Sequence, residues 1–108
     1  GAVQIFSPVS FTEVSLNMTS GTEKVEIKVA LNLDRPITEV LVKIGDGIDP
    51  TRWREVNSIQ KIENGRWTVA EINPTDLTPG IHVVRVAAID ADGRYIYDDA
   101  VMLKADTP

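Results

Sequence analysis

Apolar and polar residues alternate over residues 25–33, where every second side chain is Val, Ile or Leu. Successive side chains of an extended strand point to opposite faces, so this period of two predicts a strand with one buried and one solvated face. The pattern recurs over residues 40–44, and Asp34-Arg35-Pro36 between the two runs predicts a turn. A third run, residues 81–89, is apolar on both faces except at His82 and Arg85, which is typical of a central strand.

Turn-forming pairs separate these runs. Asn64-Gly65 is the strongest hairpin signal, because both residues tolerate positive φ, and it predicts that residues 59–63 fold back on residues 66–72. Asp92-Gly93 predicts a second hairpin, between the central strand and residues 95–104. With further strands at 3–6 and near 53–56, the pattern predicts seven or eight strands and no helix. The expected fold is an all-β antiparallel sandwich, one domain over residues 1–108, in which residues 11–18 are either the second half of the first strand or a surface loop.

The last third of the chain has a recognisable order of residues. Leu77 is followed by Pro79-Gly80, then by His82 within the alternating run, and by the turn at Asp92-Gly93. This segment resembles the E–F corner and F strand of fibronectin type III and related immunoglobulin-like modules. The resemblance implies an immunoglobulin-like β-sandwich in which Leu77 closes the bottom, Pro79-Gly80 form the corner, and His82 takes the place of the corner tyrosine.

A wider likeness extends over most of the chain. The chain is similar to the immunoglobulin-like accessory modules of secreted bacterial enzymes such as metallophosphoesterases and glycoside hydrolases. The shared positions include Ile5, the run that ends at Leu33, Trp53, Gly65-Arg66-Trp67 and Asp90-Ala91-Asp92-Gly93. The resemblance implies a non-catalytic accessory, spacer or interaction module of a larger bacterial protein, located outside the cell or at its surface. Its matched residues are core and turn positions, which describe a fold rather than a reaction.

Composition limits the partners. Sixteen carboxylate residues outweigh eleven scattered Lys and Arg residues, and the resulting net charge of −5 argues against binding to nucleic acid. The chain has no Cys, which excludes disulfides and thiol nucleophiles. Its apolar runs are far shorter than the roughly 20 residues that cross a bilayer, so membrane insertion is not expected. The sequence calls for no cofactor, and the expected partners are neighbouring domains of the parent chain, another protein or a polysaccharide.

The sequence offers no convincing catalytic residues. The only imidazole, that of His82, lies inside an apolar run, where a His is usually a hydrogen-bonded packing residue. Asp98 and Asp99 are adjacent, so on a strand their carboxylates point to opposite faces and do not converge on one bond. We therefore expect that this chain is not an enzyme.

Carbohydrate binding on a sandwich requires exposed aromatic rings that stack on sugar faces. Tyr95 and Tyr97 are expected on one face of the last strand, and Trp53 begins a short neighbouring strand. Trp67, in contrast, fits a core position. Trp53, Tyr95 and Tyr97 are therefore the candidate ligand-binding residues of an alternative function, that of a carbohydrate-binding module.

Two further sets of residues are candidates for binding. Asp90 and Asp92 surround one hairpin tip, which is similar to a calcium motif of cadherin repeats and implies, as another alternative, a calcium-stiffened adhesion repeat. The same residues also suit a plain Asp-Gly turn. Leu41, Val83 and Ile89 lie opposite the core face of their strands, so they predict either an apolar docking surface or the covered side of a two-faced strand.

Overall fold

The computed structural model describes residues 3–6, 11–19, 22–32 and 36–106. Most of the expected turn at Asp34-Arg35-Pro36 lies outside these residues. No helix in the described part of the chain has the length and apolar character needed to cross a membrane. The described residues form eight strands and one short 3-10 helix, namely β1 (Val3–Phe6), β2 (Thr12–Thr19), β3 (Thr22–Leu31), β4 (Ile37–Asp46), β5 (Arg54–Ile59), β6 (Gly65–Ile72), η1 (Pro74–Asp76), β7 (Gly80–Asp90) and β8 (Tyr95–Ala105).

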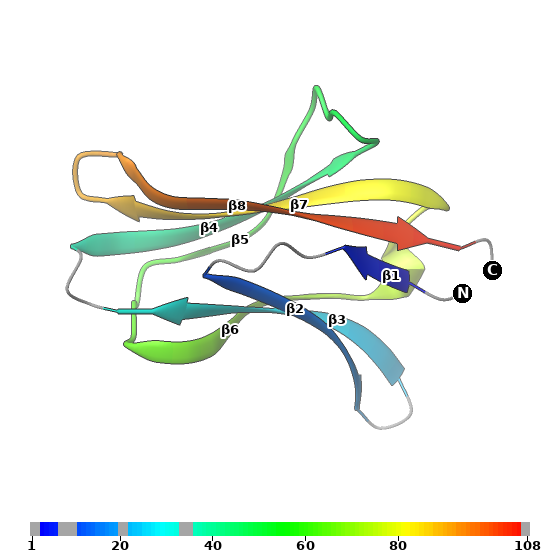
Figure 1. The fold of residues 1–108 in the computed structure, drawn as a ribbon, viewed down its shortest axis with the longest axis horizontal. Helices are drawn as coiled ribbons and strands as arrows, with labels where there is room; N and C mark the ends of the chain where they lie inside the picture. Colours follow the sequence, from blue (N-terminus) through cyan, green and yellow to red (C-terminus); the bar gives the residue numbers. More distant parts are fainter. Residues whose placement is uncertain (1–2, 7–10, 20–21, 33–35, 107–108) are drawn as a thin grey trace.

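The strands form two layers that face each other (Figure 1). One sheet has the order β1-β8-β7-β4-β5 and the other has the order β2-β3-β6, with antiparallel pairing throughout. The all-β antiparallel sandwich predicted from the sequence is therefore confirmed. The strand order is compatible with an immunoglobulin-like fold, in which strands A, B and E share one sheet and strands C, F and G share the other.

The segment at residues 11–18 is neither the second half of the first strand nor a surface loop, because residues 12–18 belong to β2, which lies in the other sheet from β1. β2 pairs along its whole length with β3 in a hairpin. Its first residues are tied to the other sheet, because the backbone N–H groups of Phe11 and Thr12 both donate to a carboxylate oxygen of Asp99, each at 3.1 Å. Asp99 therefore joins β8 to the start of β2.

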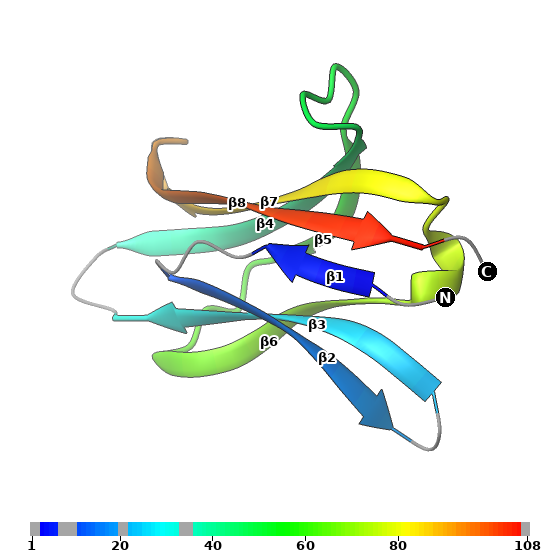
Figure 2. The same ribbon diagram turned by 45° about the vertical axis from the view of Figure 1, so that its right-hand side comes forward.

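The hairpin predicted at Asn64-Gly65 is wrong. Gly65 does adopt a positive φ of 89°, as the turn chemistry requires. However, β5 pairs with β4, and β6 pairs with β3, so the chain around Asn64 crosses from one sheet to the other (Figures 1 and 2). The side-chain amide of Asn57 donates to the carbonyl of Val69 at 2.9 Å and links the two sheets beside this crossing. The hairpin predicted at Asp92-Gly93 is confirmed by the pairing of β7 with β8.

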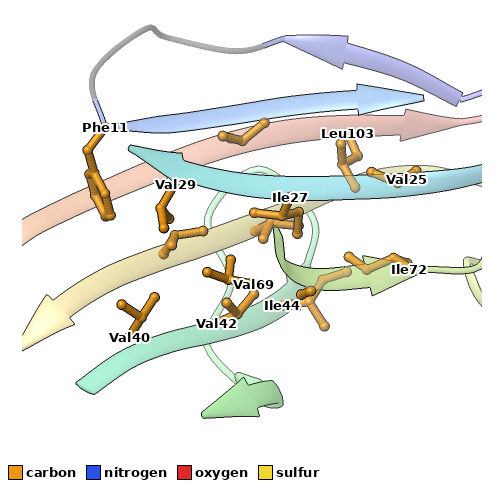
Figure 3. Close-up of a cluster of buried hydrophobic side chains, with 14 of the residues drawn as sticks. Phe11, Val25, Ile27, Val29, Val40, Val42, Ile44, Val69, Ile72 and Leu103 are labelled. Atoms are coloured by element: carbon orange, nitrogen blue, oxygen red, sulfur yellow. The ribbon is translucent and has the colours of Figure 1, made fainter. Parts of the chain in front are cut away.

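The core lies between the sheets and is formed by the inward residues of the alternating runs (Figure 3). The inward residues of the neighbouring strands β4 and β7 lie side by side in register, as Val42 does with Val86. Trp67 packs against this core as predicted, but it is only partly buried because β6 is an edge strand. Its indole N–H donates to the carbonyl of Glu63 at 3.0 Å. The largest side chains with almost no exposed surface are Ile27, Leu103, Val25, Val29, Val40, Val42, Val69, Val84, Val86 and Val101.

The first and last strands are neighbours. β1 pairs with β8 in antiparallel register, so that Val3 lies opposite Ala105. The beginning of β1 and the end of β8 therefore lie at the same end of the sandwich (Figure 1).

Candidate functional site

A pocket of about 260 Å³ opens near the start of β7. One wall comes from the end of β4 and the loop that leads to β5, and the other comes from η1 and the residues that follow it. Both segments can be followed in Figure 1, where the loop projects at the top and η1 lies at the right. The pocket is lined by Ile44, Gly45, Asp46, Arg52, Trp53, Arg54, Asp76, Leu77, Thr78 and His82.

His82 connects the two walls. It is 3% exposed, with its Nε2 at 2.7 Å from the carbonyl oxygen of Thr78 and its Nδ1 at 2.8 Å from a carboxylate oxygen of Asp46. Both neighbours are acceptors, so both contacts are hydrogen bonds only when each ring nitrogen carries a proton. The expectation that His82 is a hydrogen-bonded packing residue is confirmed. Its contact with a carbonyl four residues upstream parallels the hydrogen bond of a corner tyrosine.

The loop between β4 and β5 is held by close packing. A Cβ atom placed on Gly45 would lie 2.4 Å from Cβ of Pro50, so only glycine leaves room for the loop to fold back here. Gly47 has a φ of 89°, and its N–H donates to the carbonyl of Ile81 at 2.8 Å. These contacts fix the wall that carries Trp53.

The opposite wall is also ordered by local hydrogen bonds. The side-chain oxygen of Asn73 accepts from the N–H of Thr75 at 3.1 Å and from its hydroxyl at 2.9 Å. The N–H of Leu77 donates to the carbonyl of Pro74, and the Leu77 side chain packs against the core. The resemblance gave Leu77 the role of closing the sandwich, and here it also lines the pocket.

The side chains at the pocket combine an aromatic ring with both signs of charge. Trp53 is 37% exposed, and Arg52 and Arg54 flank it in the chain. Among the described residues, neither arginine forms an ion pair. The carboxylates are those of Asp46, whose side chain is 86% exposed, and Asp76. The pocket therefore offers both hydrogen-bond donors and acceptors beside an apolar ring.

The three aromatic residues of the predicted sugar platform do not come together. A β-bulge separates Ala88, which pairs with Tyr97, from Ile89, which pairs with Tyr95. Tyr97 packs against the core and its ring lies 5.1 Å from that of Phe11, whereas Tyr95 is 47% exposed on the outer face of the five-stranded sheet. The expectation of a shared face is wrong, because the bulge interrupts the alternation.

Trp53 also lies far from Tyr95. Trp53 lines the pocket with His82 near the start of β7, whereas Tyr95 pairs with Ile89 near the end of that strand. The seven residue-to-residue steps of extended chain from His82 to Ile89 correspond to roughly 23 Å. Of the three candidate aromatic residues, Trp53 alone belongs to the pocket.

Tyr95 instead takes part in a polar cluster on the outer face. The guanidinium of Arg85 lies 5.4 Å from the centre of the Tyr95 ring and makes two hydrogen bonds to Asp98, at 2.8 and 2.6 Å. The hydrogen bonding to Asp98 raises the pKa of Arg85 above its ordinary value. Asp98 and Asp99 therefore serve different contacts on opposite faces, as their adjacent positions predicted.

The proposed docking residues Leu41, Val83 and Ile89 lie on the same outer face. Val83 and Ile89 are each 8% exposed, and Leu41 is half-buried beside Lys43 and Arg85. They therefore present little apolar surface in the isolated chain.

The candidate calcium residues lie at the β7–β8 hairpin. One carboxylate oxygen of Asp90 accepts from the N–H groups of Asp92 and Arg94, both at 2.9 Å. This is the geometry of an Asx turn. Within residues 3–6, 11–19, 22–32 and 36–106, no group of three or more His, Cys, Asp or Glu side chains is arranged to hold a metal ion.

Comparison of the chain with protein-family models and with curated proteins finds no match. Sequence reasoning identified Trp53 and His82 but missed Arg52, Arg54, Asp46 and Asp76 as their neighbours. The alternation Arg52-Trp53-Arg54 is a weak signal, because the partner wall comes from residues more than twenty positions away.

Proposed function

We propose that this chain is a non-catalytic interaction module of a larger extracellular protein. The observation that carries the proposal is the pocket beside Trp53, where a half-exposed ring and charged groups stand on two well-anchored walls. The single imidazole of the chain, that of His82, contacts one wall through each of its two ring nitrogens. A rigid, polar and aromatic concavity, with the chain's single imidazole held between its walls, is suited to recognition rather than to turnover.

We propose, more specifically, that the chain is a fibronectin type III-like accessory module of a secreted bacterial enzyme. This assignment is supported by the strand order of the two sheets and by the corner after η1. Gly80 has a φ of 115° at that corner, and His82 reaches back to the carbonyl of Thr78, as the resemblance to the tyrosine corner requires.

We propose that the module projects from its neighbouring domains and does not separate them as a spacer. Because Val3 pairs with Ala105, a chain that enters at β1 and leaves from β8 does both at one end. Two neighbouring domains joined to these strands would be close together, and the sandwich would project from them. The spacer mechanism, in which a module separates its neighbours along its length, is therefore the less favoured form of an accessory role.

The test is deletion of residues 3–105 from a full-length protein that carries them, with the two flanks joined by a short Gly-Ser linker. We expect the neighbouring domain to remain folded and to turn over a small soluble substrate at an unchanged rate, because the module supplies no reacting group. We also expect weaker attachment to the natural target surface. Loss of turnover in a neighbour that is still folded would refute the proposal.

A further inference from the structure

The chemistry of the pocket allows the ligand class to be named. We propose that the pocket binds one neutral sugar ring of a glycan, with Trp53 stacked on the ring and the four charged side chains bound to its hydroxyls. This inference rests on the proposed interaction role and adds a ligand to it. The proposed sugar site includes Trp53 but not Tyr95 or Tyr97, which lie elsewhere in the fold.

The mixture of charge signs argues for a neutral ligand. Arg52 and Arg54 are positive and Asp46 and Asp76 are negative, so groups of both signs line the pocket. A strong anion would be attracted by the arginines and repelled by the carboxylates, in a chain whose net charge is already −5. A hydroxyl group both donates and accepts, so a polyhydroxylated ring satisfies arginine donors and aspartate acceptors together.

Size and shape argue for a single ring. Small-molecule sites commonly span roughly 300–1,000 Å³. The volume of about 260 Å³ lies just below that range, which favours one sugar unit over several. Trp53 is 37% exposed and therefore retains an accessible aromatic surface, of the kind that packs against the C–H face of a pyranose.

The pocket is formed before the ligand arrives. His82 bridges Asp46 and Thr78, the N–H of Gly47 is bound to Ile81, and Gly45 allows the loop to pack through Pro50. Binding to such a site loses little conformational entropy, since the walls are already ordered. A single ring with a few hydrogen bonds is then expected to bind with a Kd on the order of 1 mM.

The experiment is a titration of the uniformly ¹⁵N-labelled chain with glucose, galactose, mannose, xylose and glucuronate, each to about 50 mM, followed by amide and indole NMR shifts. We expect at least one neutral sugar to shift resonances of residues 44–54 and 76–82, including the indole N–H of Trp53. Trp53→Ala should weaken that binding by about tenfold or more. Arg54→Gln should also weaken it. Tyr95→Ala, an exposed aromatic outside the pocket, is the matched control and should bind as the unmodified chain does.

Thermal unfolding of each variant shows whether it is folded, so a loss of binding can be assigned to the ligand contact. The inference is overturned if no neutral sugar shifts the pocket resonances, if glucuronate alone does so, or if binding survives Trp53→Ala. It is also overturned if the shifts centre on Tyr95. None of these results affects the deletion test of the interaction role, so failure of the sugar inference is distinguishable from failure of the proposed function.

Discussion

Nδ1 of His82 lies 2.8 Å from a carboxylate oxygen of Asp46, although the His82 side chain is 4% exposed and that of Asp46 is 86% exposed. A buried ring is thus joined to a solvated carboxylate at the last residue of β4. The other ring nitrogen is bound to the carbonyl of Thr78. The imidazole is therefore a cross-link between the two walls of the pocket, and its loss should affect both stability and recognition.

His82→Leu should lower the free energy of unfolding by about 2–3 kcal/mol, because the part-buried Thr78 carbonyl loses its donor. Asp46→Asn keeps an acceptor oxygen and is mostly solvated, so it should cost less than about 1 kcal/mol. Urea unfolding of both variants at one pH measures the two values. Equal losses would show that the carboxylate, and not the Thr78 contact, is the main anchor of the ring.

Asp99 and its neighbour Asp98 provide a matched pair of substitutions. Asp99→Ala removes the acceptor of two backbone N–H groups at the start of β2 and should cost about 2 kcal/mol. Asp98→Ala removes a partly exposed ion pair with Arg85 and should cost less than about 1 kcal/mol. Amide hydrogen exchange should also rise at Phe11 and Thr12 in Asp99→Ala only. Unchanged exchange at these two amides would contradict the assigned contact.

Two glycines, Gly45 near the end of β4 and Gly47 in the loop that follows, are required for different reasons. Gly45→Ala places a methyl group 2.4 Å from Cβ of Pro50, so the loop must move and the cost should be about 1–3 kcal/mol. Gly47→Ala meets no atom within 4 Å, and its cost of about 1 kcal/mol comes from the φ of 89° alone. Thermal unfolding compares the two. A larger loss for Gly47→Ala would mean that the loop does not pack on Gly45.

The layer architecture was predictable because it depends on local pattern. Alternation over residues 25–33 and 40–44 identified β3 and β4, and the doubly apolar run at 81–89 identified the central strand β7. The hairpin prediction at Asn64-Gly65 is wrong because a turn signal indicates the backbone φ but does not specify which strands pair. At Gly65 the positive φ occurs where the chain crosses from one sheet to the other.

The binding residues were harder to predict because their arrangement depends on tertiary geometry. Tyr95 and Tyr97 lie on opposite faces of the sheet because of a β-bulge, and no residue type in the sequence predicts that bulge. The pocket requires the loop that carries Trp53 to meet the segment around Leu77, and that meeting depends on the register of β4 against β7. His82 was recognisable as a packing residue, but its partner Asp46 follows only from that register.

Substitutions at the β7–β8 hairpin distinguish two roles for Asp90, that of a turn residue and that of a calcium ligand. Asp90→Ala should cost about 1 kcal/mol, because two N–H groups lose their shared acceptor, whereas Asp92→Ala should be nearly neutral. Calcium binding would raise the melting temperature of the unmodified chain, and both substitutions would abolish that rise. The turn geometry instead predicts the same melting temperature with and without millimolar calcium chloride, measured by differential scanning calorimetry.

The two tryptophans should respond in opposite ways to truncation. Trp67 packs against the core from the edge strand β6 and donates to Glu63, so Trp67→Ala should lower the free energy of unfolding by about 2–3 kcal/mol. This is less than the loss at a fully buried site, because part of the indole is already in water. Trp53 is exposed at the pocket, and Trp53→Ala should change stability by less than about 1 kcal/mol. Urea unfolding of the two variants distinguishes them, and a loss at Trp53 that matches the loss at Trp67 would show that Trp53 serves the fold rather than a ligand.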